Sequence, residues 1–379
     1  MTIDSALVGR LDAVIDAALA DQKIVGAVVL VARDGELAYG RAAGHADREA
    51  GAPMRRDTIV RFASLTKPIV SVAALALAEE GLLNLDDPVT RFLPDFRPKA
   101  ADGTEPVITI RHLMTHTSGL TYDFMEPPES AYHVTGISNG FDLPGVGMDD
   151  NLARIADWPL NFAPGSAWNY SVSTDVLGAV LAAAAGESLP SLVRRKVTGP
   201  LGMNDTDFSA VDPSRLSAAY ADAAPTPVRM GDRHTIPFAF SPLRYAPGRI
   251  LDPASFPSAG AGMAGTADNY LTFLETIRLG GGAVLNPDSA ALMSTNAIGD
   301  LPVVLMGPGY GFSLGAGVLL DPAAAGAPQS AGSWSWGGVY GASWFVDPVH
   351  RTTVVILSNT AIEGMVGAFT IGVRDAVYG

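Results

Sequence analysis

The chain has 379 residues, a formal net charge of −14, 41 glycines, 27 prolines and no cysteine. With 48% apolar residues it can build a sizeable core, so a mainly disordered chain is excluded. The acidic balance repels phosphate backbones and anionic lipid, which argues against nucleic-acid and membrane-surface partners. Without cysteine there are no disulfides, cysteine-held metals or thiol nucleophiles. Neither a leader peptide nor a spanning segment is readable, so we expect a cytoplasmic globular protein.

Apolar spacing and turn residues predict the elements of the first third of the chain. In chain order they are a helix at 7–19, a hairpin of strands at 25–32 and 36–43, and a helix from about 64 to a glycine at 81. The middle, residues 83–195, has the character of helices and loops. It includes a long segment at 121–150, typical of lids and binding loops, and an alanine-rich helix at 174–185.

The last third is extended again. Strands are predicted at 309–320, 333–340, 341–346 and 352–357, followed by a closing helix from about 361. Because strands at both ends flank a helical middle, we expect an α/β fold of the α+β type. Its mainly antiparallel sheet is formed by the N- and C-terminal segments and flanked by helices. Residues 1–82 and 196–379 would form this discontinuous sheet domain, and residues 83–195 an inserted, mostly helical domain.

The strongest chemical signal is an S-x-x-K motif formed by Ser64 and Lys67 at the start of a predicted helix. Residues three apart lie on one helical face, so the lysine can reach the serine hydroxyl. A serine becomes a useful nucleophile when a base takes its proton, and a buried lysine with a lowered pKa can be that base. The first helical turn also supplies free backbone N–H groups and the positive end of the dipole. Taken alone, the motif is short enough to occur by chance.

Two later segments give this motif a context. Tyr170 and Ser171 precede the alanine-rich helix, where they could equally form a simple helix cap. The sequence W-S-W-G-G-V-Y-G at 334–341 places glycines in a predicted strand, which marks either a close approach to the backbone or a bend.

Together, and in this order, the three segments resemble the serine β-lactamase and penicillin-binding-protein superfamily. The chain is most similar to the class C-like branch that includes family VIII carboxylesterases, which pair S-x-x-K with Y-x-[SN] and often carry W-G-G. The segments 111–120 and 258–263 also resemble recurrent signatures of that superfamily. The likeness extends from about residue 10 to residue 375 and implies a β-lactamase/transpeptidase-like fold.

The resemblance implies a role for individual residues. Ser64 would be the nucleophile, and Lys67 with Tyr170 the proton-transfer pair, with the choice of general base left open because the two titrate together. Backbone N–H groups of Ser64 and Val339 would form the oxyanion hole. The substrate-binding positions implied are Tyr122, Asp175, Trp336, Gly337 and Gly338.

A departure from the lactamase pattern bears on the substrate. Trp336 stands where the lactamases have a lysine that holds the substrate carboxylate, so a charge-assisted anchor is missing. We therefore expect a serine carboxylesterase acting on short-chain or otherwise apolar small-molecule esters, with no metal or organic cofactor. An acyltransferase, or an amide, β-lactam or peptide hydrolase, would use the same groups. A non-catalytic ligand-binding relative is a further alternative.

Three other motifs could indicate a different kind of site. The sequence G-F-S-L-G around Ser313 matches a nucleophile elbow, with Asp347 and His350 following in order, but a continued strand is predicted where an elbow needs a helix. The G-x-G-x-x-G at 260–265 lacks the apolar strand that a dinucleotide site requires. His112 and His116 have the i, i+4 spacing of zinc ligands without the intervening glutamate, and a structural role is expected for them.

Overall fold

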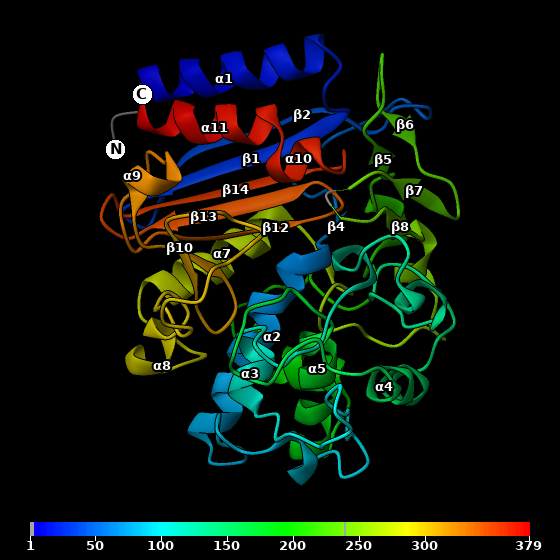
Figure 1. The fold of residues 1–379 in the computed structure, drawn as a ribbon. Helices are drawn as coiled ribbons and strands as arrows, with labels where there is room; N and C mark the ends of the chain where they lie inside the picture. The colour runs from blue at the N-terminus through cyan, green and yellow to red at the C-terminus, as the bar shows by residue number, and fades with distance from the viewer. Residues whose placement is uncertain (1–3, 239) are drawn as a thin grey trace.

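A computed structural model describes residues 4–238 and 240–379. Its centre is an eight-stranded sheet with the order β10-β11-β12-β13-β14-β1-β2-β3, in which every neighbouring pair is antiparallel (Figure 1). The first strands of the chain therefore pair with the last ones, through β1 and β14. The expected α+β fold with a sheet formed by both terminal segments is confirmed.

The strands of this sheet follow the predicted order closely. They are β1 (Gly26–Arg33), β2 (Glu36–Asp47), β3 (Ala52–Pro53), β10 (Tyr310–Phe312), β11 (Gly317–Leu319), β12 (Trp334–Gly338), β13 (Ala342–Asp347) and β14 (Thr352–Ser358). The turn between β1 and β2 is formed by Asp34 and Gly35, both at positive φ. That conformation fits the right-handed twist of a hairpin, which explains why the Asp-Gly pair located it.

Strand β1 is buried on both sides because its alternate residues serve two cores. Val28 and Leu30 belong to the large core shared with the helical part, whereas Val29 and Val31 belong to a smaller core under the terminal helices. Successive side chains of a strand point to opposite faces, so a continuous apolar run is what a doubly covered strand requires. Figure 1 shows α1 (Ser5–Ala20) and α11 (Ala368–Tyr378) side by side on one face and α7 (Ala267–Arg278) on the other.

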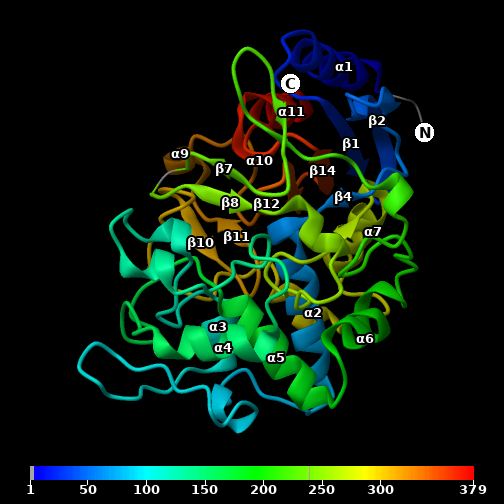
Figure 2. The same cartoon turned by 90° about the vertical axis from the view of Figure 1, so that its right-hand side faces the viewer.

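Helix α2 (Thr66–Glu79) joins the sheet to the helical part of the molecule, and it runs through the middle of that part in Figure 2. It is buried over almost its whole length and packs against α5 and α6, so its sequence is apolar on all sides. The other helices are α3 (Ile110–Met114), α4 (Met148–Asp157), α5 (Ser173–Ala185), α6 (Leu189–Val193), α8 (Pro287–Ala291), α9 (Pro322–Ala325) and α10 (Glu363–Val366). The division into a sheet domain and an inserted helical domain stays a prediction.

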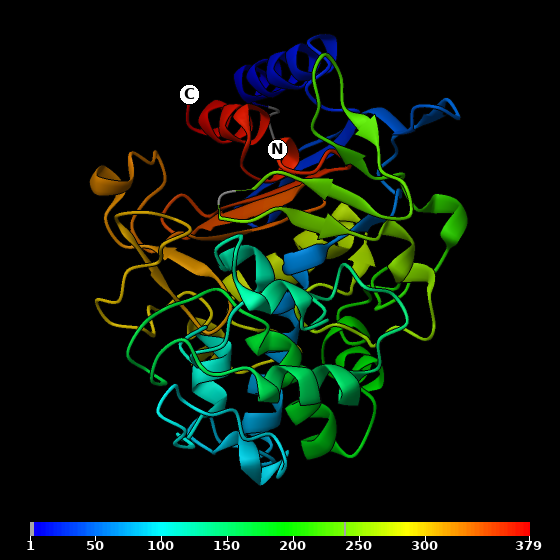
Figure 3. The same ribbon diagram turned by 45° about the vertical axis from the view of Figure 1, so that its right-hand side comes forward.

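Three small two-stranded sheets complete the fold. They are formed by β4 (Val60–Arg61) with β9 (Ala264–Gly265), by β5 (Tyr220–Ala221) with β6 (Val228–Arg229), and by β7 (His234–Ile236) with β8 (Leu243–Tyr245). The hairpins β5–β6 and β7–β8 lie beside one end of the large sheet (Figures 1 and 3). The β4–β9 pair brings the segment before α2 next to the segment before α7.

One predicted strand is wrong. Residues 309–320 form two strands, β10 and β11, joined by a tight turn at Ser313–Ala316. The Ser313 side chain accepts the backbone N–H groups of Gly315 and Ala316, at 3.3 and 3.1 Å, and thereby stabilises the turn. A serine that satisfies nearby backbone groups favours a turn over a strand, and this competition is invisible to a count of apolar residues.

No single helix of the described residues is long and apolar enough to cross a membrane. Residues 173–185 and 189–198 reach such a length and composition only as a pair, with a bend of 79° between them.

Candidate active site

Ser64 lies in a single 3₁₀ turn, Ala63–Leu65, that leads directly into α2, slightly before the helical turn predicted for it. The preceding residue, Ala63, has φ of +45°, a conformation that residues with a Cβ rarely adopt. Such strain persists only where the surroundings impose it, and it is concentrated at functional sites. Here the backbone of the neighbouring Phe62 is fixed, because its N–H donates to the Met263 carbonyl at 2.9 Å. The strained turn presents the hydroxyl of Ser64 beside Lys67 and Tyr170.

Lys67 lies one turn further along and is almost completely buried. Its Nζ is 2.8 Å from the Gly260 carbonyl oxygen, 3.1 Å from the Tyr122 hydroxyl and 3.3 Å from Ser64 Oγ. Burial lowers the pKa of Lys67 to about 7, and the negative charge of Asp175 opposes that shift. A substantial share of this lysine is therefore the neutral amine at neutral pH, the form that can accept a proton.

Tyr170 approaches the same hydroxyl from the other side. Its phenol donates to Ser64 Oγ at 2.7 Å, and its ring faces Lys67, with Nζ 4.6 Å from the ring centroid. Burial raises the pKa of Tyr170, so the phenol keeps its proton over the ordinary pH range. The tyrosine is placed by the residues around it, since Asn169 donates its N–H to the His116 carbonyl and His116 Nδ1 lies 3.1 Å from Ser171 Oγ.

The W-G-G segment forms the end of β12, next to the turn that holds Ser64. A Cβ on Gly338 would lie 2.2 Å from the Phe62 carbonyl oxygen, and one on Gly337 would lie 2.6 Å from Met365 Cγ. Glycine at position 338 is thus required for the close approach of β12 to the turn that holds Ser64, and glycine at 337 leaves room for Met365. The side chain of Trp336, half-buried, donates its Nε1–H to the Tyr170 hydroxyl at 3.3 Å.

Val339 follows β12 directly, one residue beyond the contact with Phe62. Its carbonyl accepts the Tyr245 hydroxyl at 3.1 Å, which fixes the peptide at this point. The oxyanion-hole role expected for the Val339 and Ser64 N–H groups stays a prediction, and it is consistent with their positions on two segments in contact.

Tyr122 and Asp175 both lie in the interior, at 1% and 0% exposure. The hydroxyl of Tyr122 contacts Lys67, and its ring stacks on Phe124 with the centroids 4.9 Å apart. The Asp175 carboxylate accepts the Ser258 hydroxyl at 2.7 Å and the Gly260 N–H at 3.0 Å. Both residues are therefore linked to Lys67, Tyr122 directly and Asp175 by way of Gly260.

Two contributors were not predicted as site residues. The carbonyl of Gly260 binds Lys67, and Ser258 binds Asp175. The resemblance of segment 258–263 to a signature of the superfamily is the signal that the sequence offers for them. Which atom of the segment meets which side chain depends on tertiary packing and had no signal in the sequence.

Ser313 is fully buried, and its hydroxyl is occupied in the β10–β11 turn, where it donates to the Ala316 carbonyl at 3.1 Å. Asp347 and His350, its proposed partners, bind elsewhere. The Nδ1 of His350 lies 3.0 Å from Asp347 Oδ2 and 3.1 Å from Ser330 Oγ. In a catalytic triad the serine and the carboxylate bind opposite nitrogens of the histidine ring, whereas both of these contacts of His350 involve its Nδ1.

The residues of the other two motifs, the histidine pair and the G-x-G-x-x-G, make contacts within the protein. His112 accepts the Thr109 N–H on its Nδ1 as part of the cap of α3, whereas His116 is buried against Ser171. The residues 260–265 run past the active site into β9 and carry the Lys67 contact.

Comparison with known proteins places this site in a family. The model of the family described as Beta-lactamase matches residues 11–374. Esterase EstB of Burkholderia gladioli is 51% identical over 381 residues, which cover 100% of this chain and 97% of that protein. Monacolin J acid methylbutanoyltransferase of Aspergillus terreus is 28% identical over 374 residues, covering 87% and 85%.

Among solved structures, that of "EstCE1, a hydrolase with promiscuous acyltransferase activity" superposes with a TM-score of 0.96 and 44% identity, covering 99% of each chain. The expected superfamily and its fold are confirmed. By both the family match and the similarity to these relatives, this chain belongs to the beta-lactamase family.

Proposed function

We propose that this chain is a serine carboxylesterase that hydrolyses small apolar esters through an acyl-enzyme on Ser64. The observation that carries the proposal is the position of Ser64 Oγ, which lies 3.3 Å from Lys67 Nζ and 2.7 Å from the Tyr170 hydroxyl. A hydroxyl held between a group that can accept a proton and one that can donate a proton is equipped for acyl transfer.

In the first half-reaction, the neutral amine of Lys67 takes the Ser64 proton as Oγ forms a bond to the ester carbonyl carbon. The lowered pKa of Lys67 and the raised pKa of Tyr170 support this assignment of the base. The two groups are close enough to titrate as a coupled pair, so each step belongs to the pair. Backbone N–H groups of Ser64 and Val339 would hold the oxyanion, a contribution of about 3 kcal/mol per donor in comparable sites.

The oxyanion then collapses, and the bond to the leaving alkoxide breaks. The Tyr170 phenol is placed to give the alkoxide its proton, and the proton that Lys67 took from Ser64 restores the phenol. The products of this half-reaction are the ester of Ser64, the free alcohol and the pair in its starting protonation state. In the second half-reaction the same pair takes a proton from water as it attacks the acyl carbon, and returns a proton to Ser64 Oγ as the acid is released. Every group in this scheme belongs to the chain itself.

The surroundings favour an uncharged, apolar substrate. Trp336 packs edge-on against Phe312 with the ring centroids 5.3 Å apart, and Trp168 packs against both Phe312 and Tyr170. Trp336 is half-buried and packs on these buried rings, so it offers an apolar surface to a substrate, whereas a carboxylate would lose hydration there without gaining a charge-assisted bond. The name of the relative EstB supports an ester substrate.

Acyl transfer to an alcohol is the second candidate. Two similar proteins, a methylbutanoyltransferase and a hydrolase with promiscuous acyltransferase activity, favour it. The acyl-enzyme is common to both reactions, and only the acceptor differs. Product analysis with a p-nitrophenyl ester in the presence of a short alcohol separates them, because transfer yields a new ester and hydrolysis yields the acid.

The cytoplasmic location expected above stays a prediction.

The decisive experiment compares two serines. A fluorophosphonate should label the purified protein on the peptide that contains Ser64, and Ser64→Ala should lower kcat/KM for a short-chain p-nitrophenyl ester by about 10³-fold or more. Ser313→Ala is the matched control, because this buried serine acts in a turn, and it should keep most of the activity. An adduct on Ser313, or an active Ser64→Ala variant, would reject the proposal. On the same preparation nitrocefin should be cleaved much less efficiently than the ester, and the reverse order would identify a lactamase.

A further inference from the structure

The side chain of Asp175 is fixed in place by its burial and its hydrogen bonds. It lies in the first turn of α5, where the positive end of the helix dipole favours a carboxylate, and it is completely buried. Its Oδ1 accepts two hydrogen bonds, from the Ser258 hydroxyl at 2.7 Å and the Gly260 N–H at 3.0 Å. Its Oδ2 has no hydrogen-bond partner among the described residues. Burial raises the pKa of Asp175, and the bonds from Ser258 and Gly260 and the charge of Lys67 oppose that rise.

The partners of Asp175 belong to one stretch of chain, residues 256–262, which also carries the acceptor of Lys67. Gly260 is held at both ends, since its N–H donates to Asp175 and its carbonyl accepts from Lys67 at 2.8 Å. A Cβ on Gly260 would lie 3.0 Å from Asp175 Oδ2 and 2.8 Å from the Tyr122 hydroxyl, so the backbone fits tightly between these groups. The carboxylate thus reaches Lys67 through a single residue.

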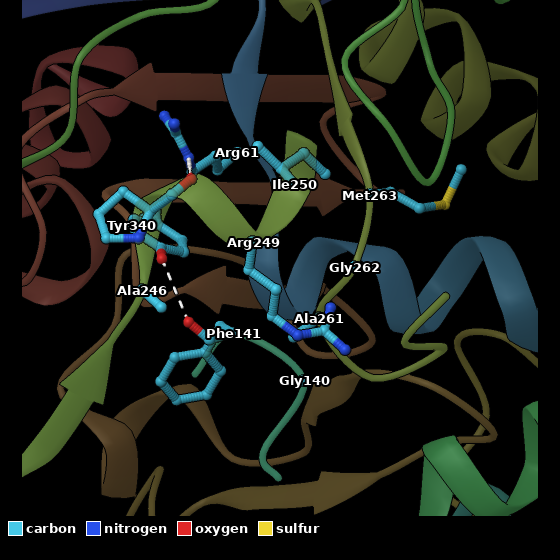
Figure 4. A pocket seen from close by; sticks show the side chains of 11 residues that line it. Arg61, Gly140, Phe141, Ala246, Arg249, Ile250, Ala261, Gly262, Met263 and Tyr340 are labelled. Carbon is cyan, nitrogen blue, oxygen red and sulfur yellow. Dashed lines mark hydrogen bonds between the residues drawn. The ribbon is translucent and has the colours of Figure 1, made fainter. Parts of the chain in front are cut away.

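The other end of the same stretch is fixed by Arg249. Its guanidinium donates to the Phe256 carbonyl at 2.8 Å and lies 4.6 Å from the centroid of the Phe256 ring. Figure 4 shows the arginine side chain extending toward Ala261 and Gly262, and the three residues line a small cavity of about 20 Å³. This cavity has room for one water molecule next to the buried arginine.

We propose that Asp175 is a positioning residue for Lys67, which it serves by holding the Ser258–Gly260 segment so that the Gly260 carbonyl fixes the lysine amine beside Ser64. The inference rests on the proposed function of Lys67, and it replaces the substrate contact expected for Asp175 from the sequence. A side chain without exposed surface acts on the reaction through the groups that it contacts.

The charge of Asp175 also affects the pKa values of the two buried cations near it. Its carboxylate opposes the lowering of the pKa of Lys67 by burial, and does the same for Arg249. The other titratable groups that face these three side chains are His116, Tyr122, Tyr132, Tyr170, Tyr340, Asp142 and Asp252. Burial keeps the histidine and the tyrosines neutral near pH 7, whereas it raises the pKa of Asp142 to about 6.

Two substitutions separate position from charge. Asp175→Asn keeps an oxygen for the Ser258 and Gly260 donors but removes the charge, so the acidic limb of kcat/KM should move to lower pH, by up to about one unit. Asp175→Ala also releases the segment, and kcat should fall by about 10²-fold, the cost of misplacing a catalytic group by about an ångström. KM for small esters should change little in both variants, because the side chain does not reach the substrate.

Asp142→Asn is the matched control, since it removes a neighbouring buried carboxylate that has no bond to the segment 256–262. Its acidic limb should stay at the wild-type position. Thermal melting and fluorophosphonate labelling of Ser64 report whether each variant is folded and retains its nucleophile. Folded Asp175 variants with the wild-type kcat and limb, or with a changed KM alone, would overturn the inference. A wild-type protein without labelling at Ser64 would instead overturn the proposed function.

Discussion

The indole N–H of Trp336 donates to the hydroxyl oxygen of Tyr170 over 3.3 Å, and the same hydroxyl donates to Ser64 Oγ at 2.7 Å. The tryptophan is therefore more than an apolar contact, because its N–H binds the phenol oxygen whose own proton is donated to Ser64 Oγ. An indole offers one neutral donor, which orients the phenol without placing a charge beside it. The W-G-G sequence combines this donor with Gly338, which lets β12 approach the turn before Ser64, and with Gly337, which packs against Met365.

Replacing Trp336 by phenylalanine should keep the aromatic packing and remove the donor. One neutral hydrogen bond contributes about 1 kcal/mol, so kcat for a p-nitrophenyl ester should fall roughly fivefold. Trp158→Phe is the control, because the Nε1 of Trp158 has no partner among the described residues and its ring packs against Tyr132. It should lower stability through lost packing while kcat stays near the wild-type value. Equal losses of kcat in both variants would argue that Trp336 acts by packing alone.

The proton-transfer pair is tested by substitutions that preserve size or charge. Lys67→Arg keeps a positive charge but cannot become neutral near pH 7, so ester turnover should be abolished. Tyr170→Phe removes the phenol next to Ser64 Oγ and should have the same result, with the fold intact by circular dichroism. The reaction with fluorophosphonate should slow in parallel. A Lys67→Arg variant with near wild-type turnover would exclude the lysine as the base.

Elements that depend on a pattern of neighbouring residues could be predicted from the sequence. The helix Ser5–Ala20, the Asp34-Gly35 hairpin and the end of α5 at Gly186, which has φ of +66°, each depend on a pattern within a few residues. The contact between Ser64 and Lys67 could also be predicted, because both residues lie within one turn of a single segment. Tyr170 needed the family resemblance, since the contact joins residues 106 positions apart.

What could not be predicted depends on contacts between distant segments. The Gly260 carbonyl reaches Lys67 across 193 residues, and Ser258 reaches Asp175 across 83. No periodicity or motif specifies which backbone oxygen completes the lysine site. The turn at Ser313 was missed for the opposite reason, because its cause is local but consists of a side chain that competes with the strand ladder.

The packing of β12 predicts a strong effect for a single methyl group. Alanine at Gly338 would place Cβ 2.2 Å from the Phe62 carbonyl oxygen, so the strand or the turn before Ser64 must move. We expect kcat of Gly338→Ala to fall by about 10²-fold, with slower labelling of Ser64. Gly9→Ala is a matched control on the exposed side of α1, where nothing lies within 4 Å of the added Cβ. It should raise stability by about 0.5–1 kcal/mol and leave kcat unchanged.

The pH dependence of the reaction follows from the burial of Lys67, which lowers its pKa to about 7. Its ammonium form predominates below this pH and cannot accept the Ser64 proton, so kcat/KM should rise as the pH increases through about 7 and then level off. Tyr170 adds no basic limb in the ordinary range, because burial raises its pKa. The check is kcat/KM for p-nitrophenyl acetate between pH 5 and 9, corrected for spontaneous hydrolysis. Fluorophosphonate inactivation, which needs the same activated serine, should follow the same curve. A profile that is flat through pH 7, or falls as the pH rises, would show that the neutral amine is not the reactive form.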